Sequence, residues 1–158
     1  MSTSKPMSSV LIPMQQRPLL LPAACIADIQ NYSRPDDNYP DIDWLLGDIH
    51  WRGQTIPLIS FERMNQGRFA EFSATNRVAI MNRTTKDKHG LIPFYAIVTQ
   101  GVPQPLTLMH EEIRNSAEEP GVIEKHRVIL REIPASIPDL KNLELQLQGA
   151  LSEVHEGI

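Results

Sequence analysis

The sequence predicts a mostly β protein that ends in one amphipathic helix. Two features predict the strands: short apolar runs recur between turn residues, and 13 prolines are spread over 158 residues. A third feature predicts the helix, because the apolar period lengthens near the C-terminus. The length suits one domain with a core that needs no disulfide.

The predicted strands follow one another at near-regular spacing, which is typical of a barrel or a sandwich. A polar segment, "NYSRPDDNYPD", interrupts them as an exposed loop. The runs are Val10–Pro13, Leu19–Leu21, Cys25–Ile29, Leu45–Trp51, Gln54–Ser60, Arg77–Asn82, Leu91–Val98, Pro105–Met109 and Val122–Ile133.

The two ends of the chain differ in pattern. Residues 1–8 are polar and patternless, which predicts a disordered N-terminus and a single domain over residues 9–158. The C-terminal helix can be capped by Ser136 or Asp139. Its apolar stripe consists of Leu140, Leu143, Leu147, Ala150 and Val154.

The stretch "GDIHWRGQTIPLIS", residues 47–60, predicts a β-hairpin whose two-residue loop is Arg52-Gly53. Gly53 supplies the positive φ that this turn needs, and the head of Arg52 lies in water. Pro57 then requires an edge strand or a site in the ladder without a hydrogen bond. The loop pairs Trp51 with Gln54, Ile49 with Ile56 and Gly47 with Leu58, and places Ile49, Trp51, Ile56 and Leu58 on one face.

Composition excludes several classes of protein. The net charge of −4 disfavours a nucleic-acid partner. The single cysteine, Cys25, allows no disulfide within the chain. No apolar run approaches the ~20 residues that span a bilayer. The run before Cys25 resembles a lipoprotein signal, but Gln15, Gln16 and Arg17 interrupt it. We therefore expect a cytoplasmic protein with no direct membrane insertion.

Motifs for chemistry are missing from the sequence. It has no nucleophile elbow, P-loop or dinucleotide fingerprint. The histidines are scattered, and the acidic loop after Asp36 lacks the glycine and glutamate of a calcium-binding EF-hand. We predict no enzymatic activity, no cofactor and no metal. The alternative is a small β-barrel enzyme or ligand-binding domain whose polar residues meet from distant segments.

Two segments, "RPLLLPAACIADIQ" and "WLLGDIHWRGQTIPLISFERM", resemble the CheW-like chemotaxis coupling proteins. The resemblance covers residues 18–64, and Ile26, Asp28 and Ile29 occupy positions where the family has Val, Glu and Val. The second half lacks the family's Val-Asp-x-Val strand, and "YAIVTQGVPQ" resembles the ChpC-type adaptors of chemosensory pili systems. The later signature is filled by Gly47, Ile49, Arg52, Gly53, Ile56, Pro57 and Leu58.

The resemblance implies a fold of two five-stranded SH3-like barrels packed through a shared hydrophobic core. It implies an adaptor that joins the regulatory domain of a CheA-type histidine kinase to the cytoplasmic tips of methyl-accepting chemoreceptors in membrane-associated arrays. A ChpC-type adaptor would control twitching by type IV pili. The implied partner-binding residues are Ile26, Asp28, Arg52 and Gly53. An alternative role for Arg52 is to pair with Asp28 or Asp48 and brace the first barrel.

Overall fold

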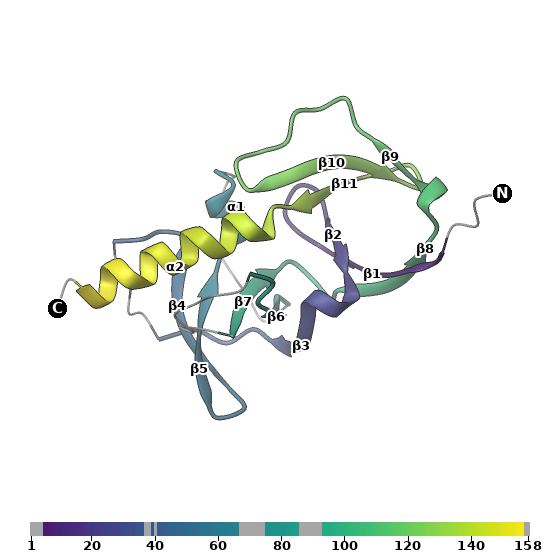
Figure 1. The fold of residues 1–158 in the computed structure, drawn as a ribbon. Coiled ribbons are helices and arrows are strands. Elements are labelled where there is room, and N and C mark those ends of the chain that lie inside the picture. The colour runs from purple at the N-terminus through teal and green to yellow at the C-terminus, as the bar shows by residue number, and fades with distance from the viewer. Residues whose placement is uncertain (1–4, 37–38, 40, 67–74, 86–92, 157–158) are drawn as a thin grey trace.

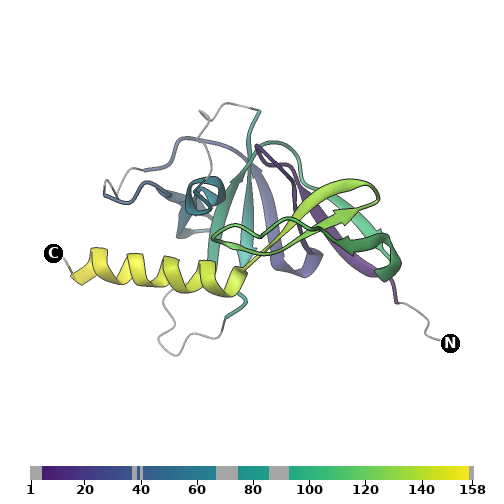
Figure 2. The same ribbon diagram turned by 90° about the horizontal axis from the view of Figure 1, so that it is seen from above.

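The computed structural model describes residues 5–36, 39, 41–66, 75–85 and 93–156, without the side chains of 154–156. Two β-sheets lie side by side, and the long C-terminal helix begins where they meet (Figures 1 and 2). The helix, α2 (Leu140–Glu156), then extends along the second sheet. The predicted class, mostly β with a C-terminal helix, is confirmed.

The first sheet combines strands from the N-terminal and the C-terminal parts of the chain. Its six strands lie in the order β8-β1-β2-β11-β10-β9. The expectation of five strands is wrong for this sheet, because the unpredicted strand β9 pairs with β10 at its edge. The strands are β1 (Met7–Ile12), β2 (Leu19–Pro22), β8 (Gln104–Leu108), β9 (Ile113–Asn115), β10 (Glu124–Leu130) and β11 (Ile133–Pro138).

The second sheet contains the middle of the chain and has five strands in the order β3-β6-β7-β5-β4. Its strands are β3 (Ile26–Asn31), β4 (Leu45–Trp51), β5 (Gln54–Ile59), β6 (Arg77–Asn82) and β7 (Phe94–Thr99). Short helical turns connect the elements: η1 (Ala23–Cys25), α1 (Phe61–Met64) and η2 (His110–Glu112).

The ends of several elements differ from the sequence-based expectation. Strand β1 begins at Met7, so the last two residues of the predicted polar segment 1–8 belong to it; residues 1–4 lie outside the described residues. The predicted run Val122–Ile133 is wrong as one strand, because the chain turns after Leu130 and returns as β11. Of the two candidate caps of α2, Asp139 is correct: its Oδ1 accepts the backbone N–H of Asn142 at 3.1 Å.

Three apolar clusters hold the domain together. One lies within the first sheet and one within the second, and the largest is shared between both sheets, α1 and α2. Strand alternation divides the side chains among them: in β6, Ala79 and Met81 face the shared core, whereas Val78 and Ile80 face the core of their own sheet. Strands buried on both faces explain the nearly continuous apolar runs.

Candidate partner-binding surface

The β4–β5 hairpin has the predicted register. Trp51 pairs with Gln54 and Ile49 with Ile56, so Arg52 and Gly53 form the two-residue corner. Their φ angles are 47° and 76°, the left-handed values of the tight turn that suits a twisted hairpin. Pro57 lies in an interior strand, but the parallel pairing of β5 with β7 starts one residue later, at Leu58. The prediction of an unbonded site for Pro57 is therefore consistent with the ladder.

Trp51 packs against the corner from the core of the second sheet. Its side chain is buried, packs in the core of the second sheet and meets Phe94 edge to face at 4.9 Å between ring centroids. The guanidinium carbon of Arg52 lies 4.8 Å from the centroid of the Trp51 ring. A cation over an indole face is attracted by the ring quadrupole. The Arg52 side chain is therefore held in a defined position although it is exposed.

Asp28 connects the corner to the opposite edge of the sheet. The indole Nε1 of Trp51 donates a hydrogen bond to Asp28 Oδ2 at 3.0 Å. Asp28 belongs to β3 and Trp51 to β4, the two outermost strands of the five-stranded order. This bond therefore bridges the two edges of the sheet. A register shift in β3 between Ile26 and Asp28 accompanies it; such bulges commonly re-aim a side chain.

The electrostatics of Asp28 follow from these contacts. The indole hydrogen bond is the largest influence that lowers the pKa of the Asp28 carboxyl, and the charge of Arg52 lowers it further. Asp28 also accepts the backbone N–H of Ile29 at 2.9 Å. The carboxylate form is therefore favoured. The carboxylate and the guanidinium both lie beside the buried indole of Trp51.

The other carboxylate considered as a brace, Asp48, is engaged elsewhere. Its Oδ1 accepts the hydroxyl of Tyr39 at 2.8 Å, and its backbone forms an isolated bridge with Asp36. In the described part of the chain, no carboxylate oxygen lies within 4.0 Å of a guanidinium nitrogen of Arg52. The bracing contact at this corner is thus made by Trp51 to Asp28, and Arg52 lies on top of it.

The structure brings only part of the predicted site together. Asp28, Arg52 and Gly53 lie at the corner or on its support. Ile26 is half-buried and packs against the shared core instead. Sequence reasoning did not give Trp51 a role in the site, although its predicted place beside the turn and on the buried face was correct. Ile29, an exposed apolar side chain next to Asp28, was matched to the family motif but was not included in the predicted site.

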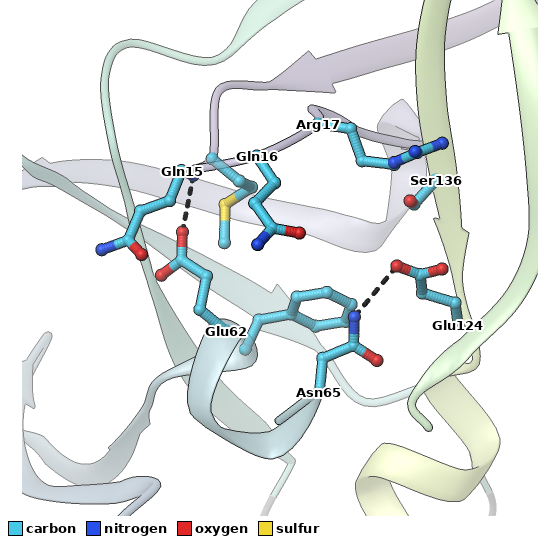
Figure 3. A pocket seen from close by; sticks show the side chains of 9 residues that line it. Gln15, Gln16, Arg17, Glu62, Asn65, Glu124 and Ser136 are labelled. Atoms are coloured by element: carbon cyan, nitrogen blue, oxygen red, sulfur yellow. Dashed lines mark hydrogen bonds between the residues drawn. The ribbon is translucent and has the colours of Figure 1, made fainter. Parts of the chain in front are cut away.

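A second group of polar side chains lines a small pocket between the first sheet and α1 (Figure 3). Glu62 Oε1 accepts the backbone N–H of Gln15 at 2.8 Å, and Asn65 donates to Glu124 at 2.9 Å. Arg17 pairs with Glu118 outside it. Ser136 Oγ is buried and has no hydrogen-bond partner among the described residues. The lining residues come from distant segments, so no sequence pattern pointed to this pocket.

The pocket does not assemble a reaction centre from its polar groups. Burial raises the pKa of the Glu62 carboxyl above its ordinary value. The opposite carboxylate, Glu124, is held by Arg127 Nε at 2.7 Å and by the backbone N–H of Gly121 at 2.8 Å. The hydrogen bonds of both acids go to neighbouring protein groups, which is the pattern of a structural junction.

No three His, Cys, Asp or Glu side chains in the described ranges are grouped so that they could hold a metal ion. Among the same residues, no helix has the length and apolar character needed to cross a bilayer.

The protein thus has two sheets around a shared core. At a hairpin corner it presents the exposed guanidinium of Arg52, which Trp51 holds in place. The CheW-like domain model matches residues 8–143, and the chain belongs to this family, a family of scaffold and adaptor proteins. No curated protein sequence matches the chain.

A solved structure is similar in fold. The scaffolding protein TtCheW from Thermoanaerobacter tengcongensis superposes with a TM-score of 0.70 over 87% of each chain, at 13% sequence identity. At this identity the similarity concerns the fold alone. It agrees with the prediction of a CheW-like fold.

Proposed function

We propose that this protein is a signalling adaptor that couples the cytoplasmic tips of methyl-accepting chemoreceptors to the regulatory domain of a CheA-type histidine kinase. Membership of the CheW-like family supports the adaptor class. The partner-binding site is supported by the exposed guanidinium of Arg52, which lies over Trp51. Trp51 in turn donates a hydrogen bond to Asp28. This arrangement is suited to binding another protein.

Arg52 has the chemistry that a docking contact needs. A guanidinium is a planar fork of donors that can bind a carboxylate or a pair of carbonyl groups on a receptor helix. Because Trp51 and the left-handed turn already fix its position, less side-chain entropy is lost when a partner binds. Gly53 leaves the corner open, since an added Cβ there would meet none of the atoms that the structure describes within 4 Å. Ile26 contributes from beneath, through the packing of β3.

The test is binding of the purified full chain to a receptor-tip fragment and to the kinase regulatory domain, measured by calorimetry. We expect Arg52→Ala to weaken receptor-tip binding at least tenfold, as expected for an arginine hot spot. Asp28→Ala should weaken it less, because the Trp51 indole is loosened while the guanidinium remains. Circular dichroism and urea unfolding check that both variants stay folded.

Arg131→Ala is the matched control, because Arg131 occupies the corresponding corner of the other hairpin. It should bind the receptor tip like the wild type. Equal binding by wild type and Arg52→Ala would refute the role of the corner while leaving the adaptor proposal intact. Failure of the wild type to bind either partner would refute the adaptor proposal itself.

A finer part of the proposal concerns the output, which we assign to type IV pilus motility. It rests on the resemblance of "YAIVTQGVPQ", residues 95–104, to ChpC-type adaptors. This segment links the two sheets, from β7 to the start of β8. Deletion of the gene should reduce twitching and leave swimming unchanged. A swimming defect with normal twitching would contradict this assignment.

A further inference from the structure

A groove runs along α2 on a different face from the Arg52 corner. Two adjoining hollows, which share Asp43, Trp44 and Gln146, form it between α2 and the segment before β4. We call it the Trp44 groove. In Figure 1 the tip of the β4–β5 hairpin points away from α2, so the groove is a second surface and goes beyond the function proposed above.

Gly149 is the feature of the groove that the fold itself does not explain. It lies inside α2, where glycine is the poorest helix former apart from proline. Its φ is not in the left-handed region, and a Cβ added there would meet no atom of the described residues within 4 Å. Neither backbone conformation nor packing within the described residues therefore requires glycine. A bare helix backbone does allow a second helix to approach closely.

The floor and the rim of the groove differ in character. Trp44 is half-buried and packs against the shared core, which leaves part of its ring on the floor. Val122, 50% exposed, adds apolar surface at one end. The rim carries the exposed carboxylates of Asp41, Asp43 and Glu153. Among the described lining residues, Arg63 is the basic one, and its guanidinium donates to the backbone oxygen of Asp43.

We propose that the Trp44 groove docks an amphipathic helix of another protein. That helix would place a small apolar residue over Gly149 and lysine or arginine side chains beside Asp41, Asp43 and Glu153. An apolar floor with an acidic rim matches a basic amphipathic helix, because such helices bind grooves through apolar residues spaced three and four positions apart. Complementary charge on the rim sets the choice of partner.

The test uses the ¹⁵N-labelled full chain and two synthetic 16-residue helical peptides. Both peptides carry the same apolar stripe with a central alanine, and the flanking positions are lysine in one and glutamate in the other. We expect the lysine peptide to shift the Gly149 amide and the Trp44 indole resonances in a saturable way. The glutamate peptide should shift neither, and 0.5 M salt should weaken the lysine peptide at least threefold.

Gly149→Gln fills the groove with a better helix former. This variant should raise the melting temperature by about 2–4 °C, yet weaken the lysine peptide at least tenfold. The rise in melting temperature shows that any lost binding is not lost folding. Lys125→Gln, an exposed substitution on β10, should leave the affinity unchanged.

Several results would overturn the proposal. They are no saturable shift with either peptide, equal shifts with both, or unchanged lysine-peptide affinity in Gly149→Gln. Groove resonances that move with protein concentration in the absence of peptide would assign the groove to a second copy of this chain, which also contradicts a basic helix as occupant.

Discussion

Two hairpin corners in the described part of the molecule have nearly the same backbone conformation and differ in their side-chain contacts. In the β4–β5 corner Arg52 and Gly53 have φ angles of 47° and 76°; in the β10–β11 corner Arg131 and Glu132 have 46° and 70°. Both turns have two residues, and both begin with arginine. Arg131, however, pairs with Glu112 and donates to the Thr107 carbonyl at 3.1 Å. Its donors therefore serve its own sheet.

Arg52 makes the opposite use of the same turn. Its guanidinium lies over an aromatic ring, which holds the side chain but occupies none of its hydrogen-bond donors. The turn thus fixes where an arginine stands, whereas the neighbouring side chains determine whether it binds groups of its own protein or of a partner. Three predictions test this difference, in order of decreasing effect.

The largest effect is expected from removing the ring. Trp51→Ala should lower the free energy of unfolding by about 3–5 kcal/mol, because a large buried side chain and the bridge to Asp28 are both lost. Trp51→Phe keeps most of the apolar burial and loses the N–H, so about 1–2 kcal/mol is expected. Urea unfolding measures both values. If Trp51→Ala costs less than about 1 kcal/mol, Trp51 does not close the second sheet.

A smaller effect is expected from exchanging the second turn residues. Glu132→Gly should raise the free energy of unfolding by about 0.5–1 kcal/mol, because the left-handed conformation is unfavourable for a residue with a Cβ. Gly53→Glu should destabilise it by about 1 kcal/mol for the same reason, since no neighbouring atom obstructs the new Cβ. Thermal unfolding of both variants gives the comparison. Two shifts of the same sign would show that strain is not the difference between the corners.

The smallest effect concerns acid. The pKa of Asp28 is lowered mainly by the Trp51 indole, and that of Glu112 mainly by its hydrogen bond from Arg131. Because the pKa is lower in the folded state, each carboxylate stabilises the fold at pH values above its unfolded-state pKa of about 4. This stabilisation is lost as the pH falls through the folded-state pKa. Carboxyl NMR titrations should show both midpoints below their ordinary values.

Salt separates the two causes. Because the indole is neutral and the guanidinium is charged, 0.5 M salt should raise the pKa of Glu112 more than that of Asp28. In Trp51→Phe the pKa of Asp28 should move back toward its ordinary value. An Asp28 pKa that stays low in this variant would mean that the hydrogen bonds from Ile29 and Gln30 and the charge of Arg52, and not the indole, lower it.

The sequence was sufficient for the first hairpin and not for the second. Alternation around Arg52-Gly53 defines a register because the glycine marks the turn locally. Around Arg131 no glycine or asparagine marks a turn, and apolar residues stand on both sides, so the pattern merges two strands into one run. Strand β9 was missed because three residues carry too little periodicity to be recognised.

In the candidate site, too, contacts between residues far apart in the sequence were not predicted. The resemblance pointed to Asp28 and Arg52, but not to the indole that joins them, since Trp51 and Asp28 are 23 positions apart and meet only when the sheet curves its edges together. Glu144 was not predicted to be buried, because it lies beside the apolar stripe of the C-terminal helix and not in it. In the structure it is buried in α2 and accepts the Tyr95 hydroxyl at 2.8 Å. Contacts of this kind depend on the tertiary arrangement, which no local pattern contains.

The shared core has a mechanical consequence. Strands such as β6 send alternate side chains into two cores, so neither sheet can slide or bend without disturbing the packing of both. A load applied at the β4–β5 corner is therefore distributed over the whole domain. We therefore expect the spacing between partners bound at two of its surfaces to change little under load.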